Sequence, residues 1–361
     1  MEGEKETRAW HVCPPTYSSA DVVDLAGEDR LACVAMEAAA VTSAGHLGFV
    51  EKLRVLLACL VALVLLCTVG WQVAQPVDPQ QALTLTQAGR GILAVWPTLL
   101  VLTAVAAGIG TILAGPRLPE AGAFAAGVGL AGLALRGYSM QTVLAYAGSN
   151  ELGGRRSLMA SMAGETLLWA AILAVAWVVA DGVRRWLWPD QSAEGGDQES
   201  DPPGRGPAAA PQNRKPAAAA ATGSGWPAFA VTTVAAALVI WLTIARTPVA
   251  EIARGQVYAS VAGGLLLGAL VARYFTDVPD ARWYVLAVPA VALIGYLLGY
   301  LNAGMGWTQG SGYQPFAELA TTPPHVLVRP LPIEYAAVGL AGALAGFWSG
   351  QKIHHAAEGS S

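Results

Sequence analysis

Residues 55–74 read VLLACLVALVLLCTVGWQVA, an apolar run of 20 residues that contains no charged side chain. A helix rises 1.5 Å per residue, so about 20 apolar residues cross a hydrocarbon layer of about 30 Å. Lipid offers the peptide groups no hydrogen-bond partners, and a helix satisfies them internally. This stretch therefore predicts a membrane-spanning helix.

The composition of the whole chain points the same way. Of the 361 residues, 54% are hydrophobic and only 13% are charged, and the mean hydropathy is +0.47. A soluble domain carries about 25% charged residues. The 41 glycines suit helices that pack closely within a membrane. These numbers argue against a water-soluble globular protein.

Seven further apolar runs resemble the first one. Together the eight candidate spans are 55–74, 92–114, 121–147, 158–180, 226–245, 257–275, 283–301 and 333–350. The third run is the weakest, because it is rich in glycine and contains Arg136 and Gln141. We expect an all-α, polytopic transmembrane bundle of eight spans in two halves. If the third run does not cross, seven spans are the alternative.

The distribution of basic residues gives an orientation. With eight spans and a cytoplasmic N-terminus, 14 of the 21 Lys and Arg residues fall on the cytoplasmic side, as the positive-inside rule favours. Both termini are then cytoplasmic. Alanine, glycine and a preference for arginine over lysine suggest a bacterial inner membrane.

Spans and polar segments together predict five regions. Residues 1–52 form an acidic cytoplasmic tail, in which 28–42 is either a short amphipathic helix or loosely ordered. We expect residues 187–225 to form a disordered cytoplasmic linker, because residues 189–225 are rich in proline and lack large apolar side chains. The complete division is 1–52 tail, 53–186 first four-helix half, 187–225 linker, 226–351 second four-helix half with a long outer loop at 302–332, and 352–361 C-terminal tail.

Several functional classes lack the residues they need. No basic stripe could follow a nucleic-acid backbone, and no motif for a P-loop, a zinc protease or an intramembrane protease occurs. The four cysteines form no C-x-x-C pair, so we expect neither a metal site nor a cofactor. The sequence thus favours a non-enzyme whose partner is the lipid bilayer, with a protein partner possible through the tail or the linker. It leaves the oligomeric state open.

Two ionisable residues fall at membrane depth. Glu165 lies seven residues into the fourth run, and Arg136 lies in the latter half of the third. Isolated charges there cost about 2.5–3.5 kcal/mol each, and pairing would offset the cost. We therefore predict an ion pair between Arg136 and Glu165, which acts either as a clamp between helices or as a proton or substrate site. By contrast, Glu251 and Arg254 sit between two spans, and we expect them to face solvent.

The spacing of glycines and the positions of aromatic residues give two further predictions. Glycines at G-x-x-x-G spacing predict close packing of spans six, seven and eight; they are Gly264, Gly268, Gly295, Gly299, Gly342, Gly346 and Gly350. Aromatic residues of the outer loop and the seventh span either lie in the headgroup region or cap an outward-facing cavity. This possible lid consists of Tyr296, Tyr300, Trp307, Tyr313 and His325.

Two functions compete. A small-solute transporter or carrier is favoured by the buried polar pair and by the resemblance of LAVWP at 93–97 to LAVP at 286–289, which hints at an inverted repeat. A non-catalytic membrane scaffold or assembly factor is the alternative, favoured by the tail, the linker and the glycine spacing. A water-filled cavity beside Glu165 or Arg136 would favour transport, and a dry core would favour a scaffold.

Overall fold

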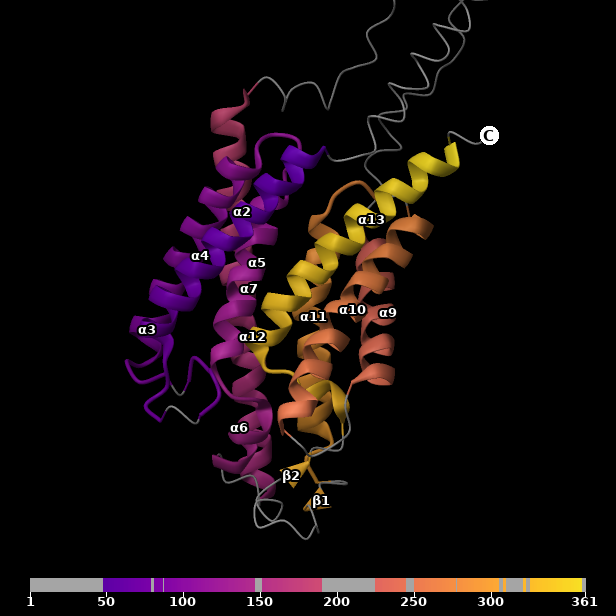
Figure 1. Ribbon diagram of the computed structural model, residues 1–361. Coiled ribbons are helices and arrows are strands. Elements are labelled where there is room, and N and C mark those ends of the chain that lie inside the picture. Colours follow the sequence, from indigo (N-terminus) through magenta and orange to yellow (C-terminus); the bar gives the residue numbers. More distant parts are fainter. Residues whose placement is uncertain are drawn as a thin grey trace, which may run out of the picture. The chain divides into compact units, whose positions relative to one another are not determined.

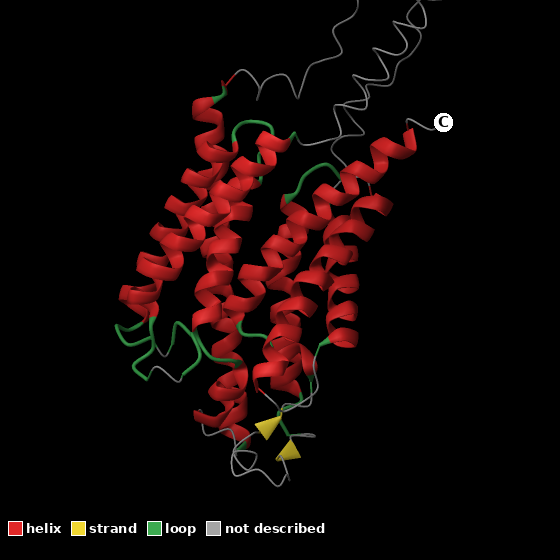
Figure 2. Cartoon of the chain, in the orientation of Figure 1, coloured by secondary structure: helices red, strands yellow, loops and turns green. Residues whose placement is uncertain are grey.

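The computed structural model is almost entirely helical (Figures 1 and 2). It describes residues 48–78, 81–86, 88–146, 151–189, 225–244, 250–276, 278–304, 308–309, 321–322 and 325–358. The helical segments before residue 190 are α2 (Phe49–Leu65), the π turn η1 (Leu66–Gly70), α3 (Trp71–Ala74), α4 (Ile92–Ala114), α5 (Ala121–Arg136), α6 (Met140–Tyr146) and α7 (Leu152–Leu187). Those after it are α9 (Trp226–Thr243), α10 (Ala250–Thr276), α11 (Arg282–Leu301), the 3-10 turn η4 (Val326–Val328), α12 (Pro332–Glu334), the π turn η5 (Tyr335–Gly339) and α13 (Leu340–Glu358). Two short antiparallel strands, β1 (Thr308–Gln309) and β2 (Thr321–Thr322), pair in the loop after α11.

Six helices are long and apolar enough to cross a membrane. They are Phe49–Ala74, Ile92–Ala114, Leu152–Leu187, Trp226–Thr243, Arg254–Thr276 and Arg282–Leu301. The other two expected spans are shorter or divided. Helix α5 has 16 residues, about 24 Å of rise, and the last run consists of α12, η5 and α13 in succession. The helices indicate a multi-pass membrane protein, but the count of eight spans is not confirmed.

The expected division into two halves is not confirmed. Residues Gly48–Ser361 form one compact unit. Helices α2 to α7 lie to one side in Figure 1 and α9 to α13 to the other, and α7 packs on α11 while α5 packs on η5. The expected tail helix at 28–42 and nearly all of the expected linker lie outside the described residues, so both stay predictions.

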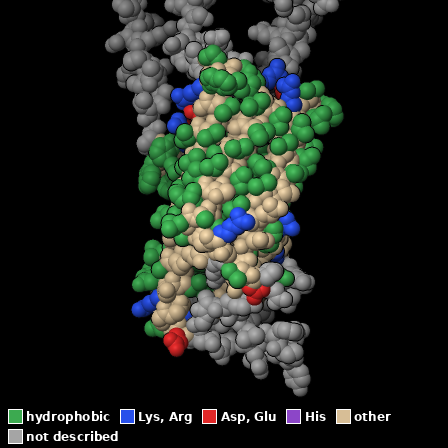
Figure 3. All heavy atoms as spheres, turned by 90° about the vertical axis from the view of Figure 1, so that its left-hand side faces the viewer, with side chains coloured by type: hydrophobic (Ala, Val, Ile, Leu, Met, Phe, Trp, Pro, Cys, Tyr) green, Lys and Arg blue, Asp and Glu red, His purple; other side chains and the backbone are tan. Residues whose placement is uncertain are grey.

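The bundle is apolar outside and built from small residues inside. Large side chains such as Leu167 (58% exposed) and Val178 (67% exposed) point outward, whereas the core is dominated by alanine. Figure 3 shows hydrophobic side chains over a broad part of one face, with charged side chains near its upper end and again below it. A soluble protein rarely exposes so large an apolar surface. This arrangement suits helices that face lipid.

The glycines let neighbouring backbones approach. A Cβ at Gly342 or Gly346 of α13 would overlap the backbone of Ala262 or Leu266 of α10. Gly264 and Gly268 of α10 instead face α9 (span five), outside the expected trio of spans six to eight. The remaining expected glycines face other elements: Gly295 faces Leu327, Gly299 faces Val328 and Met159, and Gly350 faces Arg273.

Replacing Gly268 by alanine should destabilise the bundle. The new Cβ would lie 2.8 Å from the carbonyl oxygen of Thr232 and 3.0 Å from the amide nitrogen of Ala236, both in the backbone of α9. Overpacking of this kind costs about 1–3 kcal/mol. We expect a lower melting temperature in detergent, measured by intrinsic fluorescence.

Gly263 provides the control on the same helix. A Cβ there meets no atom within 4 Å, and alanine is favoured over glycine in a helix by about 1 kcal/mol. Gly263→Ala should therefore keep or raise the melting temperature. Equal melting temperatures for the two variants would contradict the close contact between α9 and α10.

Candidate functional site

Two acidic side chains are buried in the helical bundle. Glu165 of α7 and Glu334 of α12 are each 1% exposed, and they are the only buried acids among the described residues. Ionisable residues at such positions in membrane proteins are rare and usually functional. We call the surroundings of these two residues the carboxylate site.

The Glu165 carboxylate has one close hydrogen bond. The indole N–H of Trp169, one turn further along α7, donates to Glu165 Oε1 at 3.1 Å. The backbone of Leu85 and Thr86 lies near the same carboxylate. Within the described part of the chain, Oε2 has no hydrogen-bond partner. One oxygen of this buried acid is thus left available.

The expected ion pair between Arg136 and Glu165 does not form. Arg136 ends α5 on its exposed side, where its guanidinium donates to the carbonyl oxygen of Cys67 at 2.7 Å. The same guanidinium lies 5.1 Å from the ring centre of Trp71. The two residues lie in neighbouring helices but on different faces, so each finds another partner.

The second acid lies at the start of the last helix. The backbone N–H of Leu331 donates to Glu334 Oε2 at 2.7 Å, an arrangement that caps the helix. Oε1 has no hydrogen-bond partner among the described residues. Arg254 and Tyr258 of α10 lie within electrostatic range of this carboxylate. Glu334 therefore lies near both a cation and a hydroxyl of α10.

Arg254 corrects a second expectation. Instead of facing solvent, it is half-buried and donates to the carbonyl oxygen of Ala134 in α5. Its guanidinium lies 5.7 Å from the ring centre of Tyr258. The reason is that α10 begins earlier than expected, at Ala250, so Arg254 belongs to the helix and faces the bundle.

Two tyrosines connect the carboxylate site to the segment before α12. Tyr296 of α11 donates to the carbonyl oxygen of Pro330 at 2.5 Å, and Tyr335 donates to that of Leu327 at 2.8 Å. Tyr296 also lies within electrostatic range of both Glu165 and Glu334. Non-helical backbone at membrane depth must find partners within the protein. These hydroxyls supply them.

A small cavity adjoins the site. It lies between α7, α11 and the start of the last helix, next to Trp169, Pro289 and Tyr335. Its volume is about 10 Å³, which is room for about one water molecule. This cavity therefore has space only for a small occupant.

The expected aromatic lid is only partly described. Trp307 and Tyr313 lie outside the described residues. Tyr296 is buried whereas Tyr300 is 40% exposed, with its ring centre 5.8 Å from the Arg156 guanidinium. These two tyrosines therefore do not form one surface beneath the loop. His325 is half-buried at the end of that loop.

Sequence reasoning did not include Glu334 or Arg254 in the site. Glu334 follows Pro332 by two residues, and proline at the first helical position with glutamate at the third marks a helix start. That signal places Glu334 inside a helix. No comparable signal identifies Arg254, because its role depends on how α10 is rotated towards α5.

Replacing Tyr335 by phenylalanine should destabilise the fold. The change leaves the buried carbonyl of Leu327 without its hydrogen bond, and an unsatisfied buried group costs about 1–3 kcal/mol. We expect a lower melting temperature in detergent. The control is Tyr300→Phe, whose exposed ring should make the change nearly neutral. A Tyr335→Phe protein as stable as the control would contradict the proposed contribution of the hydrogen bond from Tyr335 to the Leu327 carbonyl.

Acidification should destabilise the protein through His325. Burial lowers the pKa of this imidazole below its ordinary value of about 6.5. The unfolded chain then binds a proton at a higher pH than the folded chain, so stability falls as pH drops through about 6.5. The melting temperature of the natural protein should decline relative to that of His325→Gln between about pH 7.5 and pH 5.5. Parallel curves for the two proteins would show that His325 does not contribute.

Comparisons with known proteins add no family. No protein-family model, curated protein or solved structure matches the chain. The function must therefore be argued from the geometry of the site.

Proposed function

We propose that the chain is an eight-span carrier for a small solute, and that Glu165 and Glu334 bind the proton or cation that is coupled to its movement. The observation that carries this proposal is the burial of two carboxylates, each with one oxygen that lacks a hydrogen bond in the described structure. Packing alone does not explain such residues, because apolar side chains of similar size would avoid the desolvation.

The eight-span topology rests on helix packing and charge. Helix α5 packs against α2 and α4, and α13 packs against α10 and α11, so both accompany the six apolar helices. Most residues of α5 are buried, which reduces the lipid contact that its 16 residues must provide. An even number of spans puts both termini on one side, and the basic residues favour the cytoplasmic side of a bacterial inner membrane.

A coupling mechanism follows from the two acids. A buried carboxyl group that has lost its hydration has a lower free energy when it is protonated or paired with a cation than when it carries an isolated charge. Tyr296 contacts the loop before α12 and lies within electrostatic range of both acids. A change in the charge of either acid would thus act on the junction between the loop and the last helix.

The last helix has the features of a moving part. Its start combines an irregular buried segment, the short helix α12 and the π turn η5. Pi turns recur at functional positions in helices, and broken helices form the binding sites of many transporters. Because the cavity next to Trp169 and Tyr335 has room for about one water, passage of a solute there requires this region to open.

A non-catalytic scaffold is the second candidate. The small size of the cavity next to Trp169 favours it, since a scaffold needs no path for a solute. In that case the acids would serve to fix the arrangement of helices. The two functions differ in one measurable respect, which is movement of protons or solutes across a membrane.

Replacing either acid by glutamine should strongly reduce proton uptake. The full chain is reconstituted into vesicles that contain a pH-sensitive dye, and a potassium diffusion potential is set with valinomycin. Amino acids, sugars and small organic acids are then added in turn. We expect the natural protein to move protons with at least one of them, and Glu165→Gln and Glu334→Gln to lose about tenfold or more of that rate.

Glu51→Gln provides a control for the loss of a carboxylate. Glu51 lies at the start of α2, where it pairs with Arg117, far along the sequence from both acids. This variant should retain the proton uptake of the natural protein. No proton movement by the natural protein with any solute, together with normal folding of Glu165→Gln, would contradict the carrier and favour the scaffold.

A further inference from the structure

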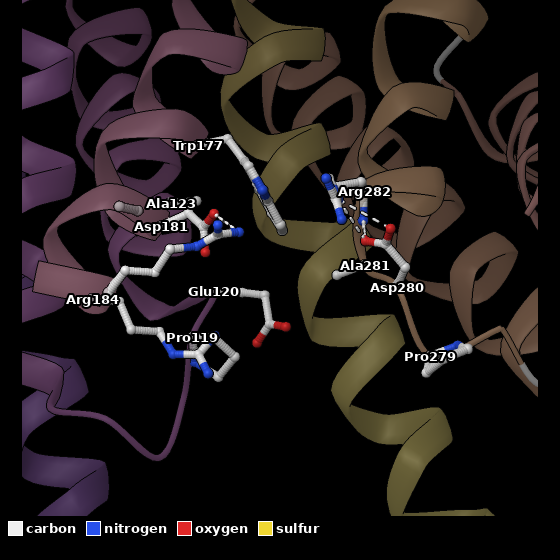
Figure 4. Close-up of a pocket in the computed structure, with 12 residues that line it drawn as sticks. Pro119, Glu120, Ala123, Trp177, Asp181, Arg184, Pro279, Asp280, Ala281 and Arg282 are labelled. Atoms are coloured by element: carbon white, nitrogen blue, oxygen red, sulfur yellow. Dashed lines mark hydrogen bonds and ion pairs between the residues drawn. The ribbon is translucent and has the colours of Figure 1, made fainter. Parts of the chain in front are cut away.

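A larger pocket opens at the end of α7 that is remote from the carboxylate site. Its volume is about 220 Å³, and its walls come from the loop before α5, the end of α7 and the loop before α11 (Figure 4). Ligand sites for drug-sized molecules usually measure about 300–1,000 Å³. The volume therefore suits a small molecule or a lipid headgroup.

Four of the six charged side chains in the pocket pair with each other. Arg185 contacts Asp181 at 2.7 Å, and Arg282 Nε contacts Asp280 at 3.0 Å. Each pair lies within one wall, the first on α7 and the second at the start of α11. These pairs neutralise themselves, so they leave no net charge for an occupant.

Glu120 and Arg184 remain. Within the described residues, neither belongs to an ion pair, although Arg184 acts on Glu120 through its charge. The indole N–H of Trp348 donates to Glu120 Oε2 at 3.2 Å, and burial raises the pKa of this carboxyl. Figure 4 shows the Glu120 carboxylate in the space between the two walls, with Arg184 on the α7 side. The pocket thus offers one anion and one cation that are not paired with each other.

We infer that this pocket binds a small zwitterion, with its ammonium group at Glu120 and its carboxylate or phosphate at Arg184. An anion alone would leave Glu120 uncompensated, and a cation alone would leave Arg184 uncompensated. The Trp177 indole also lines the pocket and offers an aromatic face to an ammonium group. A guanidinium binds carboxylate and phosphate well, so either anionic group fits.

Two kinds of molecule carry an ammonium group together with a carboxylate or phosphate. A free amino acid or phosphorylated amine carries both charges, and so does the headgroup of phosphatidylethanolamine. Pockets between helices at a membrane surface bind lipid headgroups. The pocket is separate from the carboxylate site, because Asp181 follows Glu165 by 16 residues on α7, or about 24 Å.

Binding to the purified full chain in detergent tests this inference. The soluble probes are O-phosphoethanolamine and L-alanine, measured by calorimetry, and the lipid probe is dioleoylphosphatidylethanolamine, measured by native mass spectrometry against dioleoylphosphatidylglycerol. We expect a zwitterion to bind in at least one arm. Binding only of the soluble probes identifies a free solute, and retention of phosphatidylethanolamine identifies the headgroup; either result supports the site.

Variants connect the binding to the two charges. Glu120→Gln, which can still accept from Trp348, and Arg184→Gln should each weaken binding about tenfold or more. Arg117→Gln removes an exposed charge from the loop before α5 and should bind normally. If a glutamine variant does not fold, Glu120→Asp or Arg184→Lys takes its place, with a smaller loss expected.

Three results would overturn the inference. The first is the absence of binding in both arms, and the second is normal binding by the Glu120 and Arg184 variants. The third is equally tight binding of inorganic phosphate or ethylamine, each of which carries only one of the charges. Glu165→Gln should bind the zwitterion normally, so failure of the carrier proposal and failure of this site remain distinguishable.

Discussion

The structure depends on one constraint: peptide groups inside hydrocarbon must find their hydrogen bonds within the protein. Long helices satisfy it over most of the described chain. The backbone before α12 is irregular and buried. There the hydroxyls of Tyr296 and Tyr335 donate hydrogen bonds to the carbonyl oxygens of Pro330 and Leu327. The two tyrosines also lie near the buried acids. The hydrogen bonds that stabilise the irregular backbone therefore also fix the surroundings of the carboxylate site.

Small side chains determine how close the helices come. Gly342 and Gly346 lie against the backbone of α10, while leucine and valine side chains point outward. Lipid gives no hydrophobic drive for helices to associate, so close van der Waals contact has to provide it. The close packing therefore fixes the last helix against α10.

The sequence predicts the bounds of helices better than it predicts which side chains contact each other. The second span was expected at 92–114 and forms α4 over Ile92–Ala114, because apolar length alone sets such bounds. The third run was expected to continue to 147, but α5 ends at Arg136 and α6 follows it. Arg136 and Glu165 were expected to pair because their depths match. Depth follows from the sequence, whereas the face a residue occupies follows from the packing of α5 against η1 and α4, which a span pattern does not contain.

Helix α7 carries the two polar sites at different depths, and their surroundings differ accordingly. Glu165 is buried in the core, so a charge there has few partners and a change of protonation alters the local energy strongly. Asp181, Arg184 and Arg185 lie near its end beside an open pocket, where Asp181 pairs with Arg185 and Arg184 belongs to no ion pair among the described residues. Since α7 has 36 residues, about 54 Å of rise, it exceeds a hydrocarbon layer of about 30 Å. One helix therefore connects a buried acid with a surface pocket.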